Sequence, residues 1–171
     1  MEPFTHLAVF YDSDAGRIRM SGPFLAQGLL LGQPCFLMAA GEELDSYLEH
    51  LSATPGLDLK EAMRSGLLVV ADGPGQTIAE ALDFWERSFW QALDRPGVLI
   101  RAVGEMASER TTFVSEAEML AYEAALNLST KRFPCVVLCQ YDVRRFDGPA
   151  LLSALRAHPD LLQRPLRTLF T

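Results

Sequence analysis

The stretch FPCVVLCQYDVRRF, residues 133–146, changes abruptly from apolar to polar side chains. Its first half is continuously apolar, as expected for a parallel strand that is buried on both faces. Its second half places Gln140, Tyr141 and Asp142 at the end of that strand, and two arginines follow. In open parallel sheets, ligands bind beyond the carboxyl ends of the strands. The stretch therefore predicts a buried parallel strand and a polar site at its end.

The rest of the chain alternates short apolar runs with amphipathic segments. The expected strands are continuous apolar runs at residues 5–12, 34–40, 66–73 and 97–105 and at the start of the opening stretch. The expected helices show a helical period and lie at residues 17–33, 41–51, 76–93, 115–132 and 148–159. This alternation predicts an α/β protein with three layers, in which helices cover both faces of a mainly parallel sheet. We expect strand 5–12 at the centre of the sheet, between strands four and five.

Length and composition set the broad class of the protein. The 171 residues, 49% of them apolar and 22% charged, suit one soluble domain over residues 1–171, with a core at about 5–159 and a candidate edge strand in the tail 160–171. A net charge of -7 disfavours nucleic-acid binding and docking on an anionic membrane.

The sequence also lacks the usual targeting signals. No segment approaches the roughly 18 apolar residues of a membrane span, and no basic region precedes the first apolar run. Three cysteines, an odd number, argue against a disulfide framework. A cytoplasmic location is therefore expected.

Polar residues gather at three of the predicted strand ends. These residues are Tyr11, Asp12, Asp14, Glu105, Met106, Gln140, Tyr141 and Asp142. They either line a ligand-binding pocket or cap the loops that follow. Three carboxylates buried together would disfavour their own ionisation. We therefore expect Arg101, Arg144 or Arg145 to pair with one of Asp12, Glu105 and Asp142, or one of these carboxyls to be protonated.

The segment YDSDAGRIRMSGPF, residues 11–24, stands where a phosphate-binding loop would lie. Gly16 stands alone there and no lysine follows it, so the pattern G-x-x-x-x-G-K-[ST] is missing. Asp12 and Asp14 would repel phosphate groups. Hydrolysis of nucleoside triphosphates is not expected, while nucleotide binding stays open.

Neither a metal site nor a catalytic site is expected. Cys135 and Cys139 lie about 13 Å apart along one strand, too far to chelate one ion, and all three cysteines are interpreted as small buried residues. Cys139 with Glu105 and a histidine could act as a nucleophilic set only if they met in space. No nucleophile elbow is present. His158 either contacts the core or bonds the last carbonyls of its helix.

Six segments in order resemble one known family. They are HLAVFYDSD (6–14), FLAQGLLLGQPC (24–35), RAVGEM (101–106), AYEAALN (121–127), LCQYDVRRF (138–146) and LRAHP (155–159). Together they resemble the MEDS domain, the sensory domain of methanogen and methylotroph regulators, first recognised in a repressor of dichloromethane dehalogenase. The resemblance covers nearly the whole chain. It implies a RecA/KaiC-like fold with decayed nucleotide-binding motifs, and it adds His6, Arg145 and His158 to the candidate ligand-binding residues.

The resemblance implies a non-catalytic sensor of a small molecule or signal, without a cofactor. Family members usually carry an output module, and about a dozen residues follow His158 here, so regulation of a separate partner in trans is expected. The alternative is a RecA/KaiC-like nucleotide-binding protein with residual ATPase activity.

The helix expected at residues 76–93 suggests a contact surface. Its apolar stripe consists of Ile78, Leu82, Trp85, Phe89 and Leu93, and this stripe is expected to face the sheet. Phe84 and Trp90 fall outside it. Either another segment covers these two rings, or they form a surface for a protein partner or a second copy of the chain.

Overall fold

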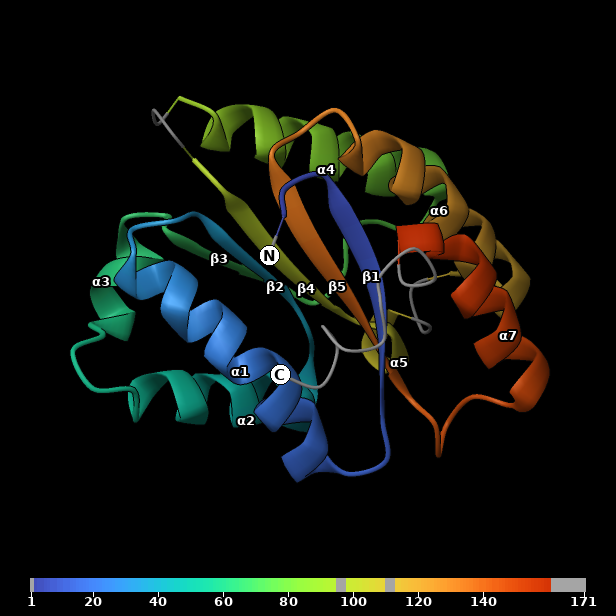
Figure 1. The fold of residues 1–171 in the computed structure, drawn as a ribbon, viewed down its shortest axis with the longest axis horizontal. Helices are drawn as coiled ribbons and strands as arrows, with labels where there is room; N and C mark the ends of the chain where they lie inside the picture. The colour runs from blue at the N-terminus through green and yellow to red at the C-terminus, as the bar shows by residue number, and fades with distance from the viewer. Residues whose placement is uncertain (1, 95–97, 110–112, 161–171) are drawn as a thin grey trace.

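The computed structural model describes residues 2–94, 98–109 and 113–160, which form three layers with helices on both faces of a five-stranded parallel sheet (Figure 1). The strands, in chain order, are β1 (Thr5–Tyr11), β2 (Cys35–Met38), β3 (Leu68–Ala71), β4 (Ile100–Glu105) and β5 (Cys135–Asp142). All paired neighbours run parallel. The predicted α/β class is confirmed. The candidate edge strand in the tail lies, from residue 161 onward, outside the described residues.

The predicted position of the first strand is wrong. The sheet order is β1-β5-β4-β2-β3, so β1 is an edge strand among the described strands and pairs with β5. The prediction assumed that only a central β1 could bring Asp12, Glu105 and Asp142 to one rim. In a parallel sheet, however, all carboxyl ends lie at the same edge, whatever the order of the strands. Asp12, Glu105 and Asp142 therefore lie at one rim of the sheet even though β1 is not central.

The helices divide between the two faces of the sheet (Figure 1). The first face is covered by α1 (Asp14–Leu30), α2 (Gly41–Ser52) and α3 (Leu59–Arg64), and we call it the α1 face. The second is covered by α4 (Ile78–Ala92), α6 (Glu116–Thr130) and α7 (Gly148–Ala157), and we call it the α6 face. A single short turn, α5 (Met106–Glu109), directly follows β4. None of the described helices is long and apolar enough to cross a membrane.

Side chains of β5 alternate between these two faces. Val136 and Leu138 belong to the apolar core under α1 and α2, whereas Val137 and Cys139 belong to the core under α4 and α6. Successive residues of a strand point to opposite sides, so this alternation continues to the end of the strand. Gln140 therefore faces α1, while its neighbour Cys139 faces α6.

Local capping explains where two helices begin. Ser13 precedes α1, and its hydroxyl accepts a hydrogen bond from the Gly16 N–H at 3.2 Å. Ser115 caps α6 in the same way, by accepting from the Glu118 N–H. In return, the Glu118 carboxylate accepts a hydrogen bond from the N–H of Val114, at 3.0 Å.

Helix α4 packs on the sheet through the predicted stripe. Trp85 and Phe89 are fully buried, and the other stripe residues pack against the same core. Of the two rings predicted to lie outside the stripe, Phe84 is partly buried and Trp90 is exposed. Phe84 packs on that core, with its ring 5.4 Å from the ring of Trp85, whereas Trp90 is 56% exposed and meets the ring of Phe133 edge-on at 5.3 Å. The exposed aromatic surface of α4 is therefore Trp90.

Candidate functional site

A buried polar cluster lies on the α1 face near the carboxyl ends of the strands. We call it the Glu105 cluster; it consists of Tyr11, Arg17, Ser21, Tyr47, Glu105 and Gln140. Tyr11, Glu105 and Gln140 come from the ends of three adjacent strands, as the sequence predicted. The other three come from α1 and α2, which cover this face.

Glu105 is the central acid of this cluster. It is fully buried, and the Tyr11 hydroxyl donates a hydrogen bond of 2.7 Å to its Oε1. Its Oε2 accepts no hydrogen bond of ordinary geometry from the described residues. Burial raises the pKa of Glu105 to about 7, although the Tyr11 hydrogen bond and the charge of Arg17 act in the opposite direction. Glu105 is thus a carboxyl that changes charge near neutral pH.

The remaining polar groups form a hydrogen-bonded chain beside Glu105. The hydroxyls of Ser21 and Tyr47 lie 2.7 Å apart, and the Gln140 amide donates to both. The guanidinium of Arg17 lies near the rings of both Tyr11 and Tyr47, 5.8 and 5.9 Å from their centroids. Burial raises the pKa of Tyr47, so its hydroxyl stays protonated and can act as a donor.

Charged residues at the outer rim pair with one another. Arg144 donates to both oxygens of Asp142, at 2.8 and 2.7 Å, and to Asp14 at 2.9 Å. This confirms the prediction that an arginine would pair with one of the three carboxylates. Arg145 instead donates to Glu43 on α2, at 2.9 Å. Asp12 is exposed, and it accepts from the hydroxyl of Ser13.

Two of the residues predicted at the strand ends lie elsewhere. Met106 and Tyr141 are fully buried in the apolar core of the α6 face, away from the Glu105 cluster. Tyr141 follows Gln140 on the same strand, so it must point to the opposite side of the sheet. Its ring stacks on Phe10 at a centroid distance of 5.6 Å. The prediction took neighbours in sequence as neighbours in space, which a strand does not allow.

The connection from β1 to α1 consists of Asp12 and Ser13 alone. A phosphate-binding loop needs several residues between its strand and its helix, with backbone N–H groups turned toward the phosphate. Here the Ser13 hydroxyl already occupies the Gly16 N–H at the start of the helix. The structure agrees with the missing sequence motif.

A second polar cluster lies on the α6 face. We call it the His cluster; it consists of His6 on β1, Glu123 on α6, Cys139 on β5 and His158 at the end of α7. All four residues are 0–2% exposed. The Glu123 Oε2 lies 2.8 Å from the Nε2 of His158 and 3.3 Å from the Nε2 of His6. The Cys139 Sγ lies 3.1 Å from the same His6 nitrogen.

Both alternatives considered for His158 prove correct. The residue is fully buried, and its Nδ1 lies 2.7 Å from the carbonyl oxygen of Ala154 in the last turn of α7. Burial raises the pKa of Glu123, but the nearby imidazoles of His158 and His6 outweigh it and hold the pKa well below its ordinary value. Burial lowers the pKa of His6, and the neighbouring His158 lowers it further.

Glu123 and Cys139 were not among the predicted site residues. Within α6, Glu123 stands four residues after buried Met119 and three before buried Leu126, so it lies on the apolar stripe of its helix. An acid in that position is the signal that could have identified it. The possible set of Cys139, Glu105 and a histidine does not assemble, because Cys139 and Glu105 point to opposite faces of the sheet.

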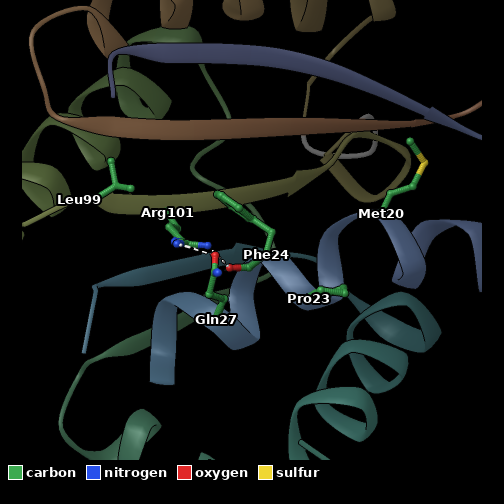
Figure 2. Close-up of a pocket in the computed structure, with 6 residues that line it drawn as sticks. All are labelled: Met20, Pro23, Phe24, Gln27, Leu99 and Arg101. Carbon is green, nitrogen blue, oxygen red and sulfur yellow. Dashed lines mark hydrogen bonds between the residues drawn. The ribbon is translucent and has the colours of Figure 1, made fainter. Parts of the chain in front are cut away.

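A hollow of about 410 Å³ opens beside α1 near the start of β4 (Figure 2). Arg101 lies in it and reaches from β4 to α1, where it donates to the carbonyl of Phe24 and to the amide oxygen of Gln27 (Figure 2). It also donates to the amide oxygen of Gln33, which follows α1. Gly28 leaves room for this arginine, since a Cβ there would lie 2.6 Å from the Arg101 Cδ. Arg101 therefore holds α1 against β4, and of the three candidate arginines Arg144 is the one that pairs with Asp142.

The chain matches one known protein family over most of its length. The family described as MEDS, the methanogen/methylotroph, DcmR sensory domain, matches residues 5–159. The transcriptional repressor DcmR of Methylorubrum extorquens is 35% identical over 163 residues, which cover 95% of this chain and 61% of the repressor. The chain thus spans less than two thirds of that relative.

Two solved structures are similar in fold. The flagellar accessory protein FlaH from Methanocaldococcus jannaschii has a TM-score of 0.66 at 9% identity, covering 92% of this chain and 70% of FlaH. The uncharacterized protein PH0321 from Pyrococcus horikoshii, solved with an unknown peptide, has a TM-score of 0.67 at 14% identity, covering 92% of this chain and 76% of PH0321. At these identities the likeness shows the fold alone, which is RecA-like.

Proposed function

The chain belongs to the MEDS family of sensory domains, and from this membership we propose that it binds a small ligand at the Glu105 cluster and thereby regulates a transcriptional or signalling partner. Such a role places the protein in the cytoplasm, with its partner. The rim charges of Asp12, Asp14, Asp142 and Arg145 form the outer edge of the proposed site. The proposal involves no catalytic step.

The observation that carries the proposal is the state of Glu105. Its carboxyl is fully buried at the carboxyl edge of a parallel sheet, where such folds bind ligands, and its Oε2 is not hydrogen-bonded in ordinary geometry. A buried polar atom without a partner is destabilising, so a ligand that donates a hydrogen bond there gains affinity. Because Tyr11, Arg17 and Tyr47 pack closely around it, the ligand must have few heavy atoms.

A thermal-shift panel tests this assignment. The panel contains ATP, ADP, and small halogenated and one-carbon compounds, each added to wild type and to Glu105→Gln and Tyr11→Phe. A ligand at 100 times its Kd stabilises the folded state by about 2.7 kcal/mol, which raises the Tm of a domain of this size by about 5 °C or more. We expect a small compound to give this shift in wild type and in the exposed control Asp83→Asn, but not in the two cluster variants. A shift that survives in Glu105→Gln would place the ligand elsewhere.

The second candidate function is nucleotide binding with residual ATPase activity. The RecA-like fold favours it, whereas the two-residue connection after β1 and the carboxylates of Asp12 and Asp14 oppose it. ATP or ADP would then raise the Tm, and phosphate release would exceed background and disappear in Glu105→Gln. A nucleotide shift with turnover would replace the sensory proposal with this one.

The partner contact is proposed at Trp90. Large exposed aromatic rings are enriched at the centres of protein interfaces, and this ring is 56% exposed on α4. Trp90→Ser should remove self-association or partner binding in sedimentation experiments without unfolding the protein. Leu152→Ser is the matched control, because Leu152 is also 56% exposed but lies on α7. Equal behaviour of wild type and both variants would dismiss the Trp90 surface.

A further inference from the structure

We propose that the His cluster binds one divalent transition-metal ion, through the side chains of His6, Glu123, Cys139 and His158, and that Zn²⁺ fits these ligands best. The cluster lies on the α6 face, across the sheet from the proposed ligand site, so this metal site is separate from the proposed function. Only the spacing of cysteines along one strand had argued against a metal. The fold brings a different set of ligands together.

The four ligand atoms of the cluster lie almost as close together as those of a tetrahedral metal site. Its four ligand atoms all lie within 4.8 Å of one another. Zinc bonds nitrogen and oxygen at about 2.0–2.2 Å and sulfur at about 2.3 Å, so the ligand atoms of a tetrahedral site lie about 3.3–3.6 Å apart. The closest pairs here are separated by 2.8, 3.1 and 3.3 Å. These pairs need to move outward only slightly to admit an ion at the centre.

Hydrogen bonding points the ring of His158 toward the centre. Its Nδ1 faces the carbonyl oxygen of Ala154 at 2.7 Å, and this nitrogen must therefore carry the proton. In the neutral ring, Nε2 then presents its lone pair to the Glu123 Oε2, 2.8 Å away. Two acceptors in contact require either a proton or a cation between them. A histidine that donates its other N–H to a backbone carbonyl is the usual arrangement of a metal ligand.

Further polar atoms of the cluster lack partners. The Glu123 Oε1 is buried and makes no hydrogen bond of ordinary geometry with the described residues, and neither do the Glu123 Oε2 and the His158 Nε2, which face each other. Such atoms are uncommon in folded proteins and call for an explanation, such as an ion. Bound Zn²⁺ would draw in the carboxylate and the imidazole and would offset the cost of burying them.

The charges and the ligand types select the ion. A thiolate and a carboxylate supply two negative charges and the two imidazoles are neutral, so a divalent cation makes the buried site neutral. One sulfur and two nitrogen ligands suit Zn²⁺ and related transition metals, whereas Mg²⁺ and Ca²⁺ prefer oxygen ligands throughout. Four protein ligands with almost no exposure indicate a closed site, which would hold α6 and α7 to the sheet.

Titration with Co²⁺, which takes the place of Zn²⁺ and is visible in absorption spectra, tests the proposal. The untagged protein is stripped of metal by a chelator and titrated with Co²⁺, and Zn²⁺ is then added. We expect one equivalent of Co²⁺ to give the visible bands of tetrahedral geometry and a thiolate-to-metal charge-transfer band, and Zn²⁺ to displace it. Cys139→Ala should lose the charge-transfer band and more than about 100-fold in affinity, since loss of a direct ligand exceeds the effect of an outer one.

Cys135→Ala is the matched control. Cys135 lies on the same strand and face and is equally buried, but it is about 13 Å from Cys139. This variant should keep both the bands and the affinity. Folded wild type that binds neither Co²⁺ nor Zn²⁺, or a Cys139→Ala variant that binds like wild type, would overturn the proposal.

A measurement on wild type alone tests the ligands without the Cys139→Ala variant, which could lose metal binding simply by unfolding. X-ray absorption of the Zn²⁺-loaded protein should show one sulfur at about 2.3 Å and three lighter ligands at about 2.0–2.2 Å. A shell without sulfur would also overturn the assignment.

Discussion

The Glu105 cluster and the His cluster lie back to back across the sheet, and each takes one of two consecutive residues of β5, Gln140 and Cys139. Both are almost completely buried and each contains one glutamate. Burial raises the pKa of Glu105 to about 7, whereas two imidazoles hold the pKa of Glu123 far below its usual range. The comparison teaches that burial alone does not fix the charge of a carboxyl. The partners that the fold supplies decide it.

The largest expected effect is the difference in stability between the variants Glu123→Gln and Glu105→Gln. At pH 6, Glu123→Gln is expected to lower the free energy of unfolding by about 3–5 kcal/mol, because it removes the buried carboxylate that faces the imidazoles of both His6 and His158. Glu105→Gln should cost about 1 kcal/mol or less, because the amide resembles the protonated carboxyl. Urea unfolding of both variants measures this difference. Similar losses in the two would contradict the assigned protonation states.

The raised pKa of Glu105 should make the stability of the protein depend on pH. The pKa of this carboxyl is raised to about 7 in the folded protein from 4.5, so its neutral form stabilises the fold at low pH. That contribution is complete below about pH 4.5 and is lost as the pH rises through 7, at roughly 1.4 kcal/mol for each unit between the two pKa values. The stability of wild type minus that of Glu105→Gln should therefore fall from pH 5 to pH 8. If this stability difference did not change with pH, the pKa of Glu105 in the folded protein would be the ordinary one.

A smaller effect is expected for Tyr47→Phe. The variant removes the hydroxyl that lies against both Ser21 and Gln140, and buried groups that lose a partner cost about 1–3 kcal/mol. Thermal unfolding measures this loss, and Co²⁺ titration of the same variant should give the wild-type spectrum. A changed spectrum would mean that the two clusters are coupled through β5 and are not independent.

The smallest effect is expected at the rim. Arg144→Ala removes the ion pairs with Asp142 and Asp14, but water screens the exposed arginine. We expect no measurable change of stability by urea unfolding in ordinary salt. A clear loss at low salt that disappears at high salt would show that the rim pairs do contribute, and that the contrast between buried and exposed charges is weaker than stated here.

Much of the fold was predictable because it depends on local patterns. Continuous apolar runs identified all five strands, and the helical period identified the face of α4 that carries Trp85 and Phe89. Strand order was not predictable in this way. Every order of parallel strands buries the same apolar runs, and the choice of β5 as the neighbour of β1 depends on packing between distant segments.

The candidate site, too, was predicted only in part. Tyr11, Glu105 and Gln140 were predicted because all parallel strands end at one edge. Arg17, Ser21 and Tyr47 lie within helices, where a single polar residue resembles an exposed one. The His cluster was missed as a unit, since its residues belong to four elements. His6 and His158 had entered the prediction only through the family resemblance.

The edge position of β1 has a consequence for the order of assembly during synthesis. Among the described strands, β1 pairs with β5 alone, so β1 must wait for its partner until about residue 142 has left the ribosome. Strands β2 and β3 can pair long before. Contacts between segments so far apart in sequence form slowly, because a long loop must close first. The nascent chain therefore grows its sheet from β2 and β3 toward β1. Docking of β1 brings Tyr11 to the Glu105 cluster and His6 to the His cluster in one step, and His158 joins the His cluster when α7 follows.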